Sequence, residues 1–352
     1  MTTGAGGAGS GGVALAPEAA PETARERLTE LMSGWSPRHL IYVAAKLGLA
    51  ERLADGPHSS SELAAALGAH ADTLRRVLRG MVAIGLLTEE NDGRFGLEEM
   101  GQLLRRDAPE PYGGRVIKSV ELGMAWGGLL HAVRTGEHPF AYVFGEGPFA
   151  HFARDPATAA LGAKLNPGTS WEVAQAIAAS YDFSPFDTVV DVGGGNGIVL
   201  AAILQRYPHL RGAVLDQPHV VEDARPVLAQ YGLDARCDFI AGDFFEVLPS
   251  GDVYLLKTIL HDWGDTRAVR ILEQCRQAMS PRGRILVVEI LLPERAVQGA
   301  FGFSGDIMML VETGGRERTE GEFRSLFTAA GFTLTQIQPL HAGQYAGRYL
   351  LE

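Results

Sequence analysis

A glycine-rich segment in the second half of the chain has the residues of a turn that holds a small ligand. The segment reads DVGGGNG over residues 191–197, and it separates a strand-like apolar run from a helical stretch. Glycines let a ligand lie close to the backbone, and a helix start offers free N–H groups with partial positive charge. The dinucleotide fingerprint G-x-G-x-x-G would need glycine at position 198, where this chain has Ile198. The segment therefore predicts a site for a nucleotide phosphate or an amino-acid carboxylate, with a plain tight turn as the structural alternative.

Polar residues also follow the next strand-like runs. Asp216 ends the run VLD about 20 residues past the glycines, where a carboxylate can accept hydrogen bonds from two ribose hydroxyls. Asp243 and Phe244 follow the third run, where a carboxylate could accept the amino group of adenine while the ring covers the base, or could form a turn beside a core ring. The fourth run leads into KTILHDW over residues 257–263, and His261 taken alone could cap the next helix. Because open α/β sheets bind ligands at the carboxyl ends of their strands, we expect these segments to share one site.

The elements that would position these residues alternate between strands and helices from about residue 184. Apolar runs predict strands over 188–192, 212–215, 237–240, 253–257 and 284–290, with helices over 198–207, 220–231 and 265–279. Buried strands separated by helices predict an α/β fold with a parallel, Rossmann-like sheet and helices on both faces. The chain is expected to close with strands over 332–338 and 347–351, the first of them stopped by Pro339.

The first half of the chain predicts a different, mostly helical domain. Residues 1–20 are rich in glycine and alanine and predict a flexible tail. Over 21–106, helices at 35–53, 62–68 and 71–84 precede a hairpin of 85–89 and 94–97, which together indicate a winged-helix domain. Residues 107–183 predict a helical linker rich in aromatic residues, with loops around Pro139 and over 145–147, and 184–352 form the α/β domain.

Composition narrows the classes of function. The chain has 352 residues with 31 basic and 42 acidic ones, a formal charge of 31 − 42 = −11, which opposes binding to a nucleic acid by charge. Its two cysteines, Cys237 and Cys275, form neither a disulfide framework nor a C-x-x-C motif, and we expect a cytoplasmic protein. Neither a membrane span, a signal peptide nor an H-x-x-x-H metal motif is visible, so no membrane and no metal are expected.

The segments DVGGGNG, LDQP, AGDFF, LKTILHDW and GGRERT, in this order, resemble the small-molecule O-methyltransferases of the plant-phenolic and bacterial-antibiotic type. The resemblance spans roughly residues 30–352. It implies a winged-helix dimerisation domain before a methyltransferase domain, a homodimer, and S-adenosylmethionine as cofactor with S-adenosylhomocysteine as product. The implied reaction is methylation of a phenolic hydroxyl on an aromatic small molecule in secondary metabolism such as antibiotic biosynthesis.

The resemblance also implies roles for individual residues. The implied general base is His261, a residue that some bacterial relatives lack, and its acidic partners are Glu289 and Glu317. A carboxylate would fix the histidine tautomer, and the imidazole would take the phenolic proton as the methyl group arrives. The implied acceptor-binding residues are Asp262, Met308 and Met309. The implied cofactor-binding residues are Asp191, Gly193, Gly195, Asp216, Asp243, Phe244, Lys257 and Trp263.

Some alternatives stay open at this point. Plant members often carry a histidine–amide pair after the two methionines, and this chain reads Val311-Glu312 there, which argues against a plant phenolic. Three arginines on the helix over 71–84 could serve a DNA-binding regulator that senses a metabolite, although the acidic composition favours dimerisation. Ile198 opposes a nicotinamide oxidoreductase. An N-methyltransferase of the same fold remains a further possibility.

Overall fold

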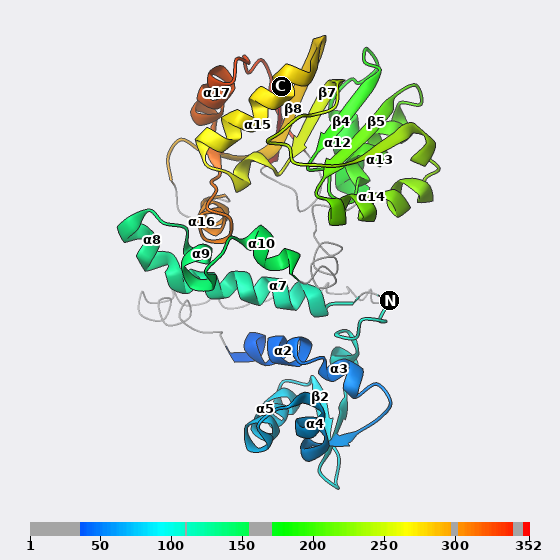
Figure 1. Ribbon diagram of the computed structural model, residues 1–352, viewed down its shortest axis with the longest axis vertical. Helices are drawn as coiled ribbons and strands as arrows, with labels where there is room; N and C mark the ends of the chain where they lie inside the picture. The colour runs from blue at the N-terminus through cyan, green and yellow to red at the C-terminus, as the bar shows by residue number, and fades with distance from the viewer. Residues whose placement is uncertain (1–35, 110, 155–170, 297–301, 341–347) are drawn as a thin grey trace, which may run out of the picture.

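The computed structural model describes residues 36–109, 111–154, 171–296, 302–340 and 348–352. Figure 1 shows three layers along the longest axis: a small N-terminal part, a row of helices that includes α7 (Gly113–Met124), and an α/β part that carries the large sheet. The predicted tail over 1–20 lies outside the described residues. Within the described ranges, none of the helices combines the length and the apolar character needed to cross a membrane.

The N-terminal part is a winged-helix arrangement, as predicted. Its helices are α4 (Ser60–Leu67) and α5 (Ala71–Ala83), and its small antiparallel sheet has the order β1-β3-β2, with β1 at His58–Ser59, β2 at Leu87–Glu89 and β3 at Arg94–Leu97. Ser59 and Glu62 form a capping box, in which each side chain accepts the backbone N–H of the other. The predicted single helix over 35–53 is wrong, because Gly48 adopts a φ of 64° and separates α2 (Ser36–Lys46) from α3 (Leu49–Arg52).

Short helices follow α6 (Glu99–Gln102) and form the middle layer. After α7 come η1 (Ala125–Gly128), α8 (Leu129–Thr135), α9 (Pro139–Phe144) and α10 (Pro148–Ala153). The predicted loop around Pro139 is wrong, because this proline occupies the first turn of α9. A proline is well suited to that position, since the first N–H groups of a helix have no partner within the helix. Phe140 is buried here together with Ala125 and with Val311 of α16 (Phe303–Glu312).

The α/β part is built on a mainly parallel sheet, which confirms the predicted fold class. The strand order is β10-β11-β8-β7-β4-β5-β6, with parallel pairs from β6 through to β8 and antiparallel pairing of β10 and β11. A two-residue strand, β9 (Arg318–Thr319), pairs parallel with the end of β8. The strands are β4 (Thr188–Val192), β5 (Arg211–Asp216), β6 (Cys237–Ala241), β7 (Gly251–Lys257), β8 (Met279–Leu292), β10 (Ile337–Pro339) and β11 (Arg348–Leu351).

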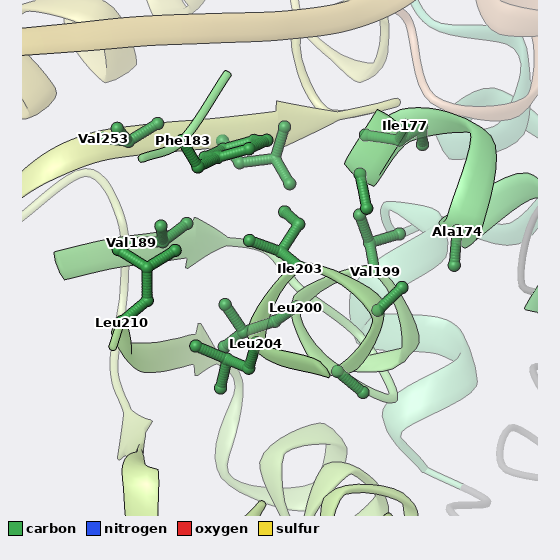
Figure 2. Packing of buried hydrophobic residues seen from close by; sticks show 14 of the residues in the cluster. Ala174, Ile177, Phe183, Val189, Val199, Leu200, Ile203, Leu204, Leu210 and Val253 are labelled. Carbon is green, nitrogen blue, oxygen red and sulfur yellow. The ribbon is translucent and has the colours of Figure 1, made fainter. Parts of the chain in front are cut away.

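Helices cover both faces of this sheet. On one face α12 (Trp171–Ser180), α13 (Ile198–Arg206) and α14 (Pro218–Gln230) pack through a cluster that includes Leu200 and Ile203; Figure 2 shows both beside Val189 of β4. On the other face α15 (Asp265–Ala278) and α17 (Glu320–Ala329) pack through a second buried cluster.

The last predicted strands are only partly correct. Residues 332–336 are not a strand, and β10 begins at Ile337. β10 does end at Pro339, although the proline itself still pairs with Tyr349 of β11. Because β10 is the edge strand of the sheet, a proline there leaves no ladder hydrogen bond unmade.

Candidate active site

The glycine turn lies directly between β4 and α13, at the carboxyl edge of the sheet. Gly193 and Gly195 have φ values of 65° and 57°, a conformation that side chains with a Cβ rarely adopt. A Cβ at Gly193 would also collide with the side chain of Ile259, which follows β7. Glycine is therefore required at position 193 by both conformation and space, and the turn presents bare backbone to the site.

Asp216 is tied to this turn, as the spacing predicted. Its Oδ2 accepts the Gly195 N–H at 2.9 Å, and its Oδ1 accepts the Gln217 N–H at 2.7 Å. Burial raises the pKa of the Asp216 carboxyl. The carboxylate still has lone pairs for further donors, which is what a partner of ribose hydroxyls needs.

Asp191 has a buried carboxyl group, one oxygen of which makes no hydrogen bond within the described residues. It is 2% exposed, and its Oδ2 has no hydrogen-bond partner among the described residues. Burial raises its pKa to about 7, while the nearby Lys257 ammonium opposes that rise. Burial also lowers the pKa of Lys257, with Arg348 acting in the same direction. The carboxylates of Asp191 and Glu289 oppose this lowering, so Lys257 interacts electrostatically with both.

Aromatic rings form a wall beside the turn. The Trp263 ring lies 4.9 Å from that of Phe245 and 6.1 Å from that of Phe244, in both cases edge to face. Asp243 is exposed, and its Oδ1 accepts the Phe245 N–H at 2.9 Å. Phe149 of α10 stacks on Trp263 at 5.5 Å. Phe149 could not be singled out from the sequence, because only its aromatic character marks it and the middle layer holds several other rings.

His261 lies in the short 3-10 turn η4 (Leu260–Asp262) with its side chain 14% exposed. Its Nδ1 is 3.0 Å from Glu317 Oε1 and 3.5 Å from Glu289 Oε2, and its Nε2 is 3.8 Å from Asp262 Oδ1. Burial lowers the pKa of this imidazole, but the three carboxylates outweigh burial and raise it to about 9. The helix-cap alternative is wrong, because the N-cap residue of α15 is Gly264.

The two acidic partners of His261 have different tasks. Glu289 of β8 is 0% exposed, and its Oε1 accepts the backbone N–H groups of Ile259 at 3.0 Å, Leu260 at 2.9 Å and His261 at 3.3 Å. Glu317 is 3% exposed and makes the shorter contact to the ring. Glu317 is therefore not a solvated surface carboxylate, although it stands in a charged stretch of the sequence. Glu289 thus contacts the backbone of the turn, and Glu317 makes the closer contact with the imidazole.

These three side chains also resemble a set of metal ligands. The ligand atoms of His261, Glu289 and Glu317 lie within 4.8 Å of one another. The 3.0 Å contact between Nδ1 and Glu317 has the length of a hydrogen bond, so a metal ion would have to displace a proton there. The expectation that this chain uses no metal stays a prediction.

The residues expected to bind the acceptor lie on η4 and α16, and Lys118 of α7 interacts electrostatically with a carboxyl on each of these elements. Met308 is exposed on α16, whereas Met309 is buried in the helix packing. Burial raises the pKa of Asp262, which lies near Lys118 of α7. Burial raises the pKa of Glu312, the residue at the plant-type amide position, to about 7. The sequence did not point to Lys118, which reaches this region only through the packing of the middle layer.

Fold and site together define a two-part α/β protein in which a bare, nucleotide-type turn adjoins a buried histidine–carboxylate pair. A model of the O-methyltransferase domain matches residues 126–333, and a model of the O-methyltransferase dimerisation domain matches residues 29–107. The chain belongs to this O-methyltransferase family, as the sequence resemblance predicted. Membership favours dimerisation over DNA binding as the role of the N-terminal part.

Similar proteins with known activities cover nearly the whole chain. The phenazine O-methyltransferase PhzM of Lysobacter antibioticus is 42% identical over 318 residues, 90% of this chain and 93% of that protein. The 8-amino-8-demethylriboflavin N,N-dimethyltransferase of Streptomyces davaonensis is 36% identical over 336 residues, 92% of this chain and 94% of that protein. A crystal structure of an O-methyltransferase from neocarzinostatin biosynthesis, in complex with S-adenosylmethionine and 2-hydroxy-5-methyl naphthoic acid, matches with a TM-score of 0.69 and 31% identity, covering 91% of this chain and 96% of that one.

Proposed function

We propose that this chain methylates a phenolic hydroxyl of an aromatic small molecule in secondary metabolism, with S-adenosylmethionine as the methyl donor and His261 as the general base. The observation that carries the proposal is the buried His261–Glu317 contact of 3.0 Å beside a glycine turn that is open to a ligand. The relative from neocarzinostatin biosynthesis, crystallised with this donor and an aromatic acid, supports the same pairing of ligands.

The residues present fit the donor. Asp191 offers an unpaired buried oxygen, which suits the amino group of an amino acid, and the space at Gly195, where a Cβ would meet nothing within 4 Å, leaves room beside the turn. Asp216 would take the ribose hydroxyls, and Asp243 with the rings of Phe244 and Trp263 would hold the adenine. When bound, the donor supplies a methyl group activated by a neighbouring sulfonium.

His261 would accept the proton of the acceptor hydroxyl. In the neutral ring with its proton on Nδ1, Glu317 accepts the Nδ1–H, and the Nε2 lone pair would be free to take the proton of a hydroxyl. The raised pKa of His261, about 9, lies close to the ordinary value of about 10 for a phenol, so the proton transfer is nearly balanced. The positive charge that develops on the ring is then stabilised by the buried carboxylates of Glu289 and Glu317.

A methyl-transfer assay with a panel of phenols, combined with His261→Ala, tests this function. We expect the variant to bind S-adenosylhomocysteine like the wild type, while kcat falls by about 10²–10⁴-fold, the usual contribution of a general base. Calorimetry with S-adenosylhomocysteine and with NAD checks the donor class separately. An unchanged kcat in the variant would remove the base assignment, and a wild type that binds NAD but not S-adenosylhomocysteine would overturn the function.

N-methylation is the second candidate, because the Streptomyces davaonensis relative is an N,N-dimethyltransferase. An amine needs less help from a base than a phenol does, since a neutral amine already carries its lone pair. Matched acceptors that differ only in hydroxyl or amino substitution separate the two activities. We expect the hydroxyl member to be methylated faster and to depend more strongly on His261.

We also propose a homodimer through the N-terminal domain and a reaction that needs no metal. The match of residues 29–107 to a dimerisation domain supports the dimer, which sedimentation can measure. Activity that survives EDTA and does not rise with added divalent cations would support metal independence, whereas loss of activity that zinc restores would assign a metal to His261 and its carboxylates.

A further inference from the structure

A buried arginine that the proposed chemistry does not use lies against the turn that carries His261. Arg318 of β9 is 1% exposed. One of its terminal nitrogens, Nη1, donates to the Leu260 carbonyl at 3.0 Å, and the other, Nη2, donates to the Trp263 carbonyl at 2.8 Å. Its Nε and Nη2 both donate to Asp265 Oδ1, at 3.0 and 2.9 Å. A single guanidinium therefore joins Leu260, the residue before the proposed base, to Trp263. We call the rings of Phe244, Phe245 and Trp263 the cofactor wall.

The rest of the same segment approaches the turn equally closely. The Arg316 N–H donates to the His261 carbonyl at 2.8 Å. A Cβ on Gly315 would collide with that same carbonyl, so glycine is required for the approach. The segment from 315 to 318 thus holds the carbonyl side of the turn, while Glu289 holds its N–H side. With both sides fixed, the backbone that carries His261 has little freedom to move.

We propose that Arg318 is a positioning residue that fixes His261 and Trp263 relative to each other, so that the base and the cofactor wall keep one geometry. This inference rests on the proposed function of the site. Arginine suits the task because its planar fork offers donors in several fixed directions, whereas lysine offers its donors from a single atom. Lysine at position 318 would keep the charge but could not reach both carbonyls and Asp265 at once.

The variant Arg318→Lys separates positioning from a purely structural role. If the turn relaxes, the imidazole withdraws from Glu317 and the wall shifts with Trp263. We expect kcat to fall about 10²-fold, since a misplacement of about 1 Å costs that much. We also expect the dissociation constant of S-adenosylhomocysteine to rise, and the acidic limb of kcat/KM to move to lower pH. A structural role alone would lower Tm and the active fraction without changing the limb.

Arg324→Lys is the matched control. Arg324 also donates to a carboxylate, Glu320 Oε1 at 2.8 Å, and to a backbone carbonyl, that of Leu334 at 3.0 Å, but it lies on α17. We expect this control to keep the kcat, product affinity and pH limb of the wild type. Arg318→Lys with wild-type kcat and product affinity would overturn the inference, and so would equal losses in both variants.

A second variant covers the case in which Arg318→Lys does not fold. Asp265→Asn removes the charge that Arg318 faces at an exposed position and leaves the arginine in place. We expect smaller changes in the same directions, and an unaltered pH limb and product affinity would refute the role of Arg318. The product titration also separates the two proposals: a wild type that fails to bind S-adenosylhomocysteine refutes the function, whereas equal binding by wild type and variants refutes the positioning role.

Discussion

Replacing Glu317 with glutamine should damage catalysis in two ways that the structure allows to be worked out. The pKa of His261 rises from 6.5 to about 9 although burial opposes the rise, so its carboxylates together stabilise the imidazolium by about 3 kcal/mol or more. Glu317 contributes both charge and the 3.0 Å hydrogen bond. Glu317→Gln should therefore lower the pKa of His261 and weaken this stabilisation. In addition, a glutamine amide can donate to Nδ1 and place the ring proton on Nε2, where it blocks the base.

We therefore expect Glu317→Gln to lower kcat by about 10²-fold or more, by analogy with the general contribution of a correctly oriented base. The acidic limb of kcat/KM should move to lower pH, because the pKa of His261 falls. The measurement is a pH profile of methyl transfer at saturating donor, with product affinity measured in parallel. Glu320→Gln is the control, because Glu320 is exposed and pairs with Arg324. A Glu317 variant with kcat within about threefold of the control and an unmoved limb would refute the orienting role.

Three further outcomes are expected. Gly193→Ala should lower Tm and weaken product binding, because position 193 has a positive φ and no room for a Cβ, while Gly147→Ala, at an open position, should do neither; thermal melts and calorimetry check both. Phe149→Ala should raise the dissociation constant of S-adenosylhomocysteine several-fold, because it removes the ring stacked on Trp263 and an aromatic pair is worth about 0.5–1.5 kcal/mol. An unchanged constant would show that α10 does not contribute to cofactor binding. Because the pKa of His261 is raised in the folded state, its contribution to stability is full below about pH 6.5 and is lost as pH rises through about 9. The difference in free energy of unfolding between wild type and His261→Gln, measured in denaturant titrations, should therefore shrink across that window. A constant difference would refute the pKa shift.

The parallel sheet could be predicted well because the patterns that indicate its strands lie within short stretches of the sequence. Each buried strand has its own apolar run, and each ligand-facing segment comes directly after a strand. The turn at Gly193 and its partner Asp216 could be paired in advance, since carboxyl ends of parallel strands meet at one edge. The hydrogen bond between Gly195 and Asp216 follows from that placement.

Other features depended on contacts that no local pattern carries. Glu317 stands in a charged stretch typical of a surface, and only the pairing of β9 with β8 buries it. Phe149 reaches Trp263 through the packing of short helices, whose order along the chain does not fix their positions. The strand expected from residue 332 begins only at Ile337, because an apolar run alone does not show where pairing with the sheet starts.

The pairing of β9 with β8 has a consequence for how such an enzyme can change its substrate. Glu289 belongs to β8, and Glu317 immediately precedes β9, which pairs with β8 at Leu291 and Leu292. The chain between these two strands carries α16, with Met308 and Met309. If the acceptor binds against α16, as we propose, substitutions on this helix would alter the acceptor space while the sheet keeps the two carboxylates in place. New acceptors could then be gained without changing the residues proposed to activate them.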